Sequence, residues 1–151
     1  MSSIIPEQLS LFKSLFKARE DVFAVRWEKN GKGNYIPVFS YDSHRYRIHQ
    51  AKGGTFQTFQ DKTYKPLTDQ ELINHLAGKQ VAGVYPLLTD NTSWLIAADF
   101  DEADWLNECR NFLRICNEYS IPAYLERSRS GNGGHIWIFF EEPYTASKAG
   151  G

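Results

Sequence analysis

The sequence has few cysteines, no excess of either charge and no long apolar run. Its 151 residues include only two cysteines, Cys109 and Cys116. They are seven residues apart within one expected helix, about 10 Å along its axis, which is too far for a disulfide bond. No histidine or further cysteine stands beside them at the spacing of a zinc site. We therefore interpret both thiols as buried core residues.

The charge balance excludes a protein with an overall basic field. The chain has 17 Lys and Arg against 18 Asp and Glu, so any site for a polyanion must be local. No apolar run approaches the roughly 18 residues of a membrane span, and the N-terminus lacks the pattern of a secretion signal. We expect a soluble, cytoplasmic protein with no membrane partner.

The remaining composition is that of a folded globule. Hydrophobic residues make up 42% of the chain and aromatic residues 15%, which argues against a disordered tail. The length suits a single domain or a fragment of one. Within residues 1–151 we distinguish an N-terminal helix and hairpin module, residues 1–86, from a half that carries the functional motifs, residues 87–151.

Periodicity and turn residues predict the order of the elements. Helices are expected at 6–18, 68–78 and 104–119, and strands at 22–27, 35–41, 81–85, 94–100, 123–126 and 135–140. The first two strands form a hairpin, and Thr68 with Glu71 has the spacing of a capping box. The strand, helix and strand between residues 94 and 126 form a βαβ-like unit, with a right-handed crossover if the strands are parallel.

The most cationic passage runs from His44 to Gly54. As a strand it would place Arg45, Arg47 and His49 on one face, a pattern that suits contact with a nucleic-acid backbone. Lys52, next to two glycines, would be able to reach a triphosphate. A solvated edge strand protected by its charges explains the same pattern.

Two carboxylates end the most strand-like segment of the chain. Because strand side chains alternate between faces, Asp99 and Asp101 are expected on one wet side, roughly 6 to 7 Å apart at Cα. The opposite face, expected to be buried, carries Trp94, Ile96, Ala98 and Phe100. Like charges at this spacing repel unless a cation lies between them, and Mg²⁺ prefers oxygen ligands. The pair is a candidate metal site; an acidic strand end that caps the next helix is the alternative.

A glycine-rich turn separates the last two expected strands. Its candidate phosphate ligands are Arg127, Ser128, Arg129, Ser130, Gly131, Asn132, Gly133 and Gly134. The glycines can adopt positive φ and leave backbone N–H groups facing an anion, while the arginines and serines supply further donors. His135, first in the next strand, would donate to a phosphate or accept a metal. An ordinary long hairpin with a half-exposed histidine is the alternative.

Taken together, the two motifs resemble those of a known family. Ala98-Asp99-Phe100-Asp101, followed downstream by Ser130-Gly131-Asn132-Gly133-Gly134-His135, is similar to the first two motifs of archaeo-eukaryotic primases and primase-polymerases. The closer likeness is to the primase domain of the bacterial TOTE conflict systems, where such a domain accompanies a helicase. Residues 11–16 with 19–22, residues 83–88 and residues 125–137 carry this closer likeness.

The resemblance implies an α+β fold, with an RRM-like antiparallel sheet flanked by helices. It implies a DNA primase or polymerase, a nucleotidyltransferase that binds a nucleoside triphosphate and a single-stranded or primed DNA template. Asp99, Asp101 and His135 would be the catalytic residues, the two aspartates as ligands of Mg²⁺ or Mn²⁺ and the histidine at the triphosphate. Two metal ions would lower the pKa of the attacking 3′-hydroxyl and stabilise the leaving pyrophosphate.

The chain departs from the family pattern in two respects. Family members have a third motif with a further acidic ligand downstream of the histidine strand, and the sequence ends before such a segment. We therefore expect the N-terminal portion of a longer protein, and the activity of this chain alone stays open. Many relatives also carry a cysteine cluster that residues 44–64 lack, so no zinc knuckle is expected.

Two other functions stay open on the sequence. A non-catalytic RRM-like module would hold a single nucleic-acid strand on Arg45, Arg47 and aromatic side chains, with a steep salt dependence. A metal-dependent nuclease would use the same carboxylates and histidine. The choice between ribo- and deoxyribonucleotides, initiation without a primer and the oligomeric state are also open.

Overall fold

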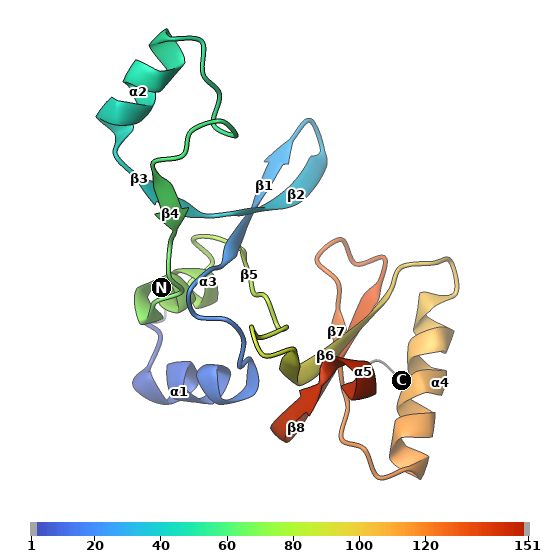
Figure 1. The fold of residues 1–151 in the computed structure, drawn as a ribbon. Coiled ribbons are helices and arrows are strands. Elements are labelled where there is room, and N and C mark those ends of the chain that lie inside the picture. Colours follow the sequence, from blue (N-terminus) through green and yellow to red (C-terminus); the bar gives the residue numbers. More distant parts are fainter. Residues whose placement is uncertain (1–2, 150–151) are drawn as a thin grey trace. The chain divides into compact units, whose positions relative to one another are not determined.

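The structure is a computed structural model that describes residues 3–149. The chain divides into two compact units. Unit 1 consists of Met1–Leu9 and Arg19–Tyr85, and unit 2 consists of Ser10–Ala18 and Pro86–Gly151. Helix α1 (Pro6–Leu15) contributes residues to both. Both units mix helices with antiparallel sheets (Figure 1), which confirms the predicted α+β fold.

Unit 1 contains two small sheets in its described part. Strands β1 (Ala24–Lys29), β2 (Lys32–Pro37) and β5 (Ala82–Gly83) form one sheet in the order β2-β1-β5. Strands β3 (Phe39–Tyr41) and β4 (Lys62–Tyr64) form the other. Helix α2 (Ser43–Ala51) lies between β3 and β4 in the chain, and α3 (Asp69–Leu76) precedes β5. The buried apolar residues of the unit are Val22, Phe23, Ala24, Phe59 and Leu72.

The predicted first hairpin is confirmed, but its second strand is shorter than expected. Strands β1 and β2 pair around Asn30 and Gly31, whose φ angles of 54° and 75° suit a tight two-residue turn. The segment predicted as one strand, 35–41, belongs to β2 and β3, which lie in different sheets. Strand β2 ends at Pro37, because proline has no N–H to continue a ladder.

The basic passage after residue 43 is a helix, so the predicted strand is wrong. The carboxylate of Asp42 accepts the backbone N–H groups of His44 and Arg45 at 2.8 and 3.0 Å, which caps α2. These two bonds hold the pKa of Asp42 below its ordinary value. Because residues two apart on a helix point to different sides, Arg45 and Arg47 do not share a basic face.

The capping box predicted at the start of α3 is also wrong. Thr68 occupies the N-cap position, but its side chain makes no capping hydrogen bond. The Glu71 carboxylate instead contacts the Lys65 amine at 2.6 Å and accepts the Gln80 amide at 2.8 Å. The ammonium group of Lys65 and the amide of Gln80 satisfy the hydrogen-bonding capacity of the Glu71 carboxylate more fully than a backbone N–H at the start of the helix would.

Unit 2 is built on a three-stranded antiparallel sheet. Strands β6 (Thr92–Phe100), β8 (Gly134–Thr145) and β7 (Tyr124–Arg127) lie in the order β6-β8-β7. Because β6 and β7 are both antiparallel to β8, they run parallel to each other with β8 between them. The predicted βαβ-like unit is therefore present in split form, with α4 (Trp105–Glu118) as its helix. A short helix, α5 (Ala146–Ala149), follows β8.

One face of this sheet is covered by α4, as the apolar stripe of the helix predicts. Cys109 and Cys116 are free and buried, and Ile136 of β8 is fully buried. The Phe112 ring meets Phe100 edge-on at 5.7 Å between centroids. Burial raises the pKa of the Cys109 thiol. The interpretation of both cysteines as core residues is confirmed.

The other face of the sheet is partly covered by residues that follow α1. The Phe16 ring lies edge-on against Trp137 and Phe139 of β8, with centroids 5.1 Å apart in each pair. Leu95, opposite Phe139, is buried, whereas the residues predicted to be buried are only half-buried: Trp94, Ile96, Ala98 and Phe100. The register of β6 with β8 is irregular between Ser93 and Leu95.

Candidate functional site

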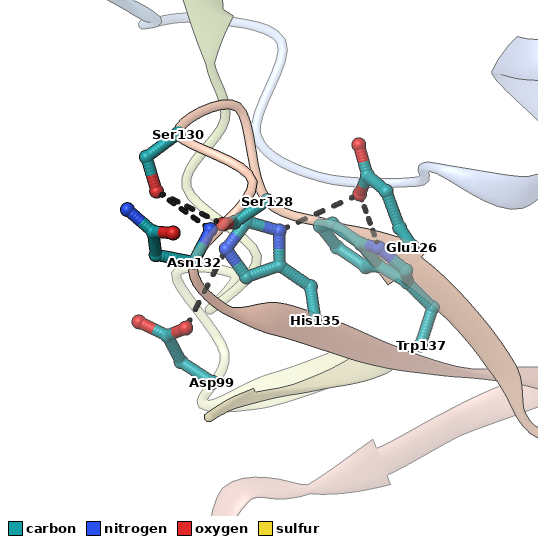
Figure 2. A network of polar contacts seen from close by, with 7 residues as sticks. All are labelled: Asp99, Glu126, Ser128, Ser130, Asn132, His135 and Trp137. Carbon is teal, nitrogen blue, oxygen red and sulfur yellow. Dashed lines mark hydrogen bonds and ion pairs between the residues drawn. The ribbon is translucent and has the colours of Figure 1, made fainter. Parts of the chain in front are cut away.

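Three neighbouring strands bring two carboxylates and an imidazole into one row. Asp99 of β6 and Glu126 of β7 both stand opposite His135 of β8, so all three side chains lie on the same face. The Asp99 carboxylate is 3.5 Å from Nε2 of His135, and the Glu126 carboxylate is 3.6 Å from Nδ1. Figure 2 shows the ring between the two acids. Each ring nitrogen of His135 therefore faces a negative charge.

The row is open to solvent at both of its carboxylates. The side chains of Asp99 and Glu126 are 68% and 59% exposed, whereas His135 is 35% exposed. Glu126 is also held in place, because the indole N–H of Trp137 donates to its Oε2 at 2.8 Å (Figure 2). The site thus combines a fixed carboxylate on one side of the histidine with a freely accessible carboxylate on the other.

Asp101 lies one residue beyond the strand that carries Asp99. Strand β6 ends at Phe100, and Asp101 is exposed. Strand alternation no longer determines its direction at this position. The placement of both aspartates on one side consequently stays a prediction.

The glycine-rich turn between β7 and β8 is closed by its own hydrogen bonds. The backbone N–H of Ser128 donates to the Gly133 carbonyl at 2.9 Å, and that of Gly131 donates to the Ser128 carbonyl at 2.9 Å. Nε of Arg127 donates to the Gly131 carbonyl at 3.1 Å. The Ser130 hydroxyl accepts from the N–H of Asn132 at 3.3 Å (Figure 2). Several donors expected to face an anion are therefore used inside the turn.

The glycines of the turn serve two different purposes. Gly131 uses the freedom of glycine and adopts a φ of 80°, whereas Gly133 and Gly134 do not adopt positive φ. Gly133 is needed for close packing instead. A Cβ at Gly133 would lie 2.7 Å from the carbonyl oxygen of Phe100 and 3.4 Å from Cα of Asp101. The turn therefore packs directly against the backbone at the end of β6, next to Asp99 and Asp101.

The comparison with known families agrees with the two motifs gathered at this place. A family model described as TOTE conflict system, Archaeo-Eukaryotic Primase domain, matches residues 7–150. The chain belongs to this family. No curated protein sequence matches it. In this TOTE primase domain, the Asp99 and His135 motifs are therefore placed side by side by the β6–β8 pairing.

The primase family is one of nucleotidyltransferase domains, for which a metal site was expected. Within residues 3–149, no three His, Cys, Asp or Glu side chains converge as a ready-made metal site. The donor set nevertheless fits Mg²⁺, because this ion is commonly held by one or two carboxylates, water and substrate phosphates rather than by a full protein cage. Asp99, exposed and free of a capping role, has the required chemistry.

Other predicted ligands of this primase domain belong to unit 1. Arg45 forms an ion pair with Asp61 at 2.5 Å, and Nε of Arg47 donates to the Ser43 carbonyl at 3.4 Å. Lys52 is the C-cap residue that follows α2 and is exposed. The predicted contacts of these three residues with nucleic acid or triphosphate stay predictions.

Sequence reasoning missed Glu126 as a member of the site. A signal for it was present, because a turn closed by Arg127 and Gly134 pairs the preceding Glu126 with the following His135. The register of the β7–β8 hairpin therefore identifies the residue that sequence spacing alone did not. In the part of the primase domain that the structure describes, no helix is long and apolar enough to cross a membrane.

Proposed function

We propose that the chain is the part of a DNA primase-polymerase that binds a nucleoside triphosphate together with Mg²⁺ or Mn²⁺. One observation carries the proposal: Asp99 and His135, from the two family motifs, stand opposite each other with the carboxylate 3.5 Å from Nε2. The glycine-rich turn is packed against the backbone next to Asp99 and Asp101. A hard-ion ligand and a phosphate ligand thus meet at one place.

Each group in this arrangement has a distinct role in the proposal. Asp99, with Asp101, offers carboxylate oxygens to the ion, and His135 contacts the triphosphate. The turn supplies positive charge from Arg127 and Arg129 at the phosphate chain. The bound ion would help to lower the pKa of an attacking 3′-hydroxyl and to stabilise charge on the leaving pyrophosphate. The template strand and a helicase of the same system are the proposed partners.

The arrangement of the sheet favours this proposal over a non-catalytic module that stacks bases. Such modules use exposed aromatic side chains on the open face of the sheet. Trp137 and Phe139 lie on that face, but Phe16 packs edge-on against both rings. Arg45 and Arg47, expected to hold the backbone, do not share a face either. The features that this module requires are therefore occupied or separated.

Calorimetric titration with a nucleoside triphosphate tests the proposal. Wild-type chain is expected to bind in the presence of Mn²⁺ or Mg²⁺ and to lose at least tenfold in affinity when the ion is removed, which corresponds to about 1.4 kcal/mol. Asp99→Asn removes a charged ligand but keeps the shape, and His135→Ala removes the imidazole. Both are expected to weaken binding by a similar factor or more.

Glu118→Gln is the matched control. Glu118 is an exposed acid of the same unit, ion-paired with Arg114 on α4, and surface pairs of this kind contribute little to stability. This variant is expected to bind like wild type. Binding that is indifferent to both the ion and Asp99 would refute the proposal. Cleavage of an oligonucleotide with Mn²⁺ and no nucleotide would point to the nuclease instead.

A further inference from the structure

We propose that Glu126 is a positioning residue that fixes the orientation and the protonated nitrogen of His135. In this assignment Glu126 accepts Nδ1–H of the imidazole, while the indole N–H of Trp137 holds the Glu126 carboxylate. Nε2 is then the nitrogen presented to Asp99 and the ligand. The consequence for the triphosphate rests on the proposed function, but the orientation itself is a property of the free chain.

One oxygen of Glu126 connects the two neighbouring rings. Oε2 accepts Nε1–H of Trp137 at 2.8 Å and lies 3.6 Å from Nδ1 of His135 (Figure 2). The second distance is that of an ion pair, and in the proposed arrangement a side-chain rotation brings the two atoms within hydrogen-bond range. Because all three residues lie on the same face of β7 and β8, no change in the backbone is needed.

Glu126 is better suited than Asp99 to fix the ring. The indole that holds Glu126 is itself held, because the Trp137 ring packs against Phe16 at 5.1 Å and lies parallel to Phe139 at 6.3 Å. Asp99 is more exposed, at 68%, and the proposed function assigns its oxygens to a metal ion. A carboxylate anchored by a packed, half-buried donor fixes its neighbour more firmly than one without such an anchor does.

The chemistry of imidazole makes the assignment measurable. A neutral histidine in water prefers the proton on Nε2, and a carboxylate at Nδ1 reverses this preference. With the proton on Nδ1, the neutral ring turns the Nε2 lone pair toward Asp99 and the glycine-rich turn, where it binds a metal ion or accepts from a donor. For contact with a triphosphate oxygen, Nε2 carries a second proton and donates, while Nδ1–H stays on Glu126. A residue that merely filled space beside His135 would leave the preference unchanged.

Long-range ¹H–¹⁵N correlation spectra of the His135 ring test the assignment in the free chain at alkaline pH. Wild type is expected to show the Nδ1–H form as the main one. Glu126→Gln, which places a neutral amide at the same position, is expected to shift the ring to Nε2–H. Trp137→Phe keeps an aromatic ring in place but removes the N–H donor, so an intermediate shift is expected. Glu118→Gln is the control, with a spectrum like wild type.

Nucleoside triphosphate titration with Mn²⁺ then separates the two proposals. Glu126→Gln is expected to weaken binding about 10- to 100-fold, the usual effect of removing a residue that orients a ligand. Suppose that Glu126→Gln shifts the His135 proton from Nδ1 to Nε2 but the wild-type chain binds no nucleotide. That result would leave the positioning role intact and overturn the proposed function. The positioning role would be overturned if wild type showed Nε2–H as its main form, or if Glu126→Gln left the position of the His135 proton unchanged. Unchanged backbone amide spectra verify that each variant is folded.

Discussion

Gly133 lies so close to the end of β6 that a side chain has no room. An added Cβ would stand 2.7 Å from the Phe100 carbonyl oxygen, which belongs to the backbone and cannot rotate away. We predict that Gly133→Ala displaces the turn from β6 and destabilises the chain by about 1–3 kcal/mol, the usual cost of overpacking. Chemical denaturation measures the loss, and amide shifts at Phe100 and Asp101 locate it.

Gly131→Ala is the control for that prediction. Here the added Cβ meets nothing nearer than the Arg127 side chain at 3.7 Å, and the cost arises from the φ of 80° instead. This variant is expected to lose stability without shifting the signals of Phe100 and Asp101. If Gly133→Ala also left those two signals unchanged, the tight contact between turn and strand would be wrong.

At the scale of single residues, the sequence indicated two members of the row that the structure brings together, Asp99 and His135. Asp99 and His135 were identified because each stands in a distinctive motif. Glu126 was not, because its role depends on the register of two strands that meet only in the folded chain. The number of donors in the turn that face an anion was overestimated for the same reason. Spacing does not reveal that the N–H groups of Ser128 and Gly131 donate to carbonyls within the turn.

At the scale of elements, α2 shows where periodicity is ambiguous. Alternating cationic and apolar residues favoured a strand, yet nine residues are too few to separate a period of 2 from one of 3.6. The deciding residue is Asp42, just before the passage, whose carboxylate caps the helix. Helix α4 was predicted correctly because its apolar stripe is longer and both of its cysteines face the core.

The start of α3 carries a buried carboxylate whose removal is expected to destabilise the chain. Glu71 is 7% exposed and contacts Lys65 at 2.6 Å and Gln80 at 2.8 Å. We predict that Glu71→Gln lowers the free energy of unfolding at pH 7 by about 1.5–3 kcal/mol, the range for a hydrogen bond to a charged group. Urea denaturation measures this difference, with Glu118→Gln as the exposed control.

The same carboxylate gives the destabilisation a pH dependence with a definite sign. Lys65, and then Gln80, hold the pKa of Glu71 below its ordinary value of 4.5 in the folded chain. The stabilisation is therefore fully present above about pH 4.5 and is lost as the pH falls through the lower, folded value. The difference in free energy of unfolding between wild type and Glu71→Gln is therefore expected to become smaller as the pH falls below about 4.5. If this difference grew on acidification, the stabilising role of the ionised Glu71 carboxylate would be contradicted.

At the scale of the whole molecule, family and charge point to a localised site. The chain matches the TOTE primase domain over residues 7–150, yet its 17 cationic and 18 anionic residues nearly cancel. A polyanion is therefore not attracted by an overall field, and any site for one must be local. The sequence contains both motifs, and the pairing of β6 with β8 brings them to one place.

The measurement that tests the central claim most directly is Mn²⁺-induced line broadening in the NMR spectrum of ¹⁵N-labelled chain saturated with a nucleoside triphosphate. A paramagnetic ion broadens signals only from nuclei close to it. We predict that the amide signals of residues 99–101 and 131–135 broaden first, while those at the C-terminal end of α4 stay sharp. In Asp99→Asn the selective broadening is expected to disappear. Broadening that spares residues 99–101, or that persists in Asp99→Asn, would contradict the claim that this row binds metal and nucleotide together.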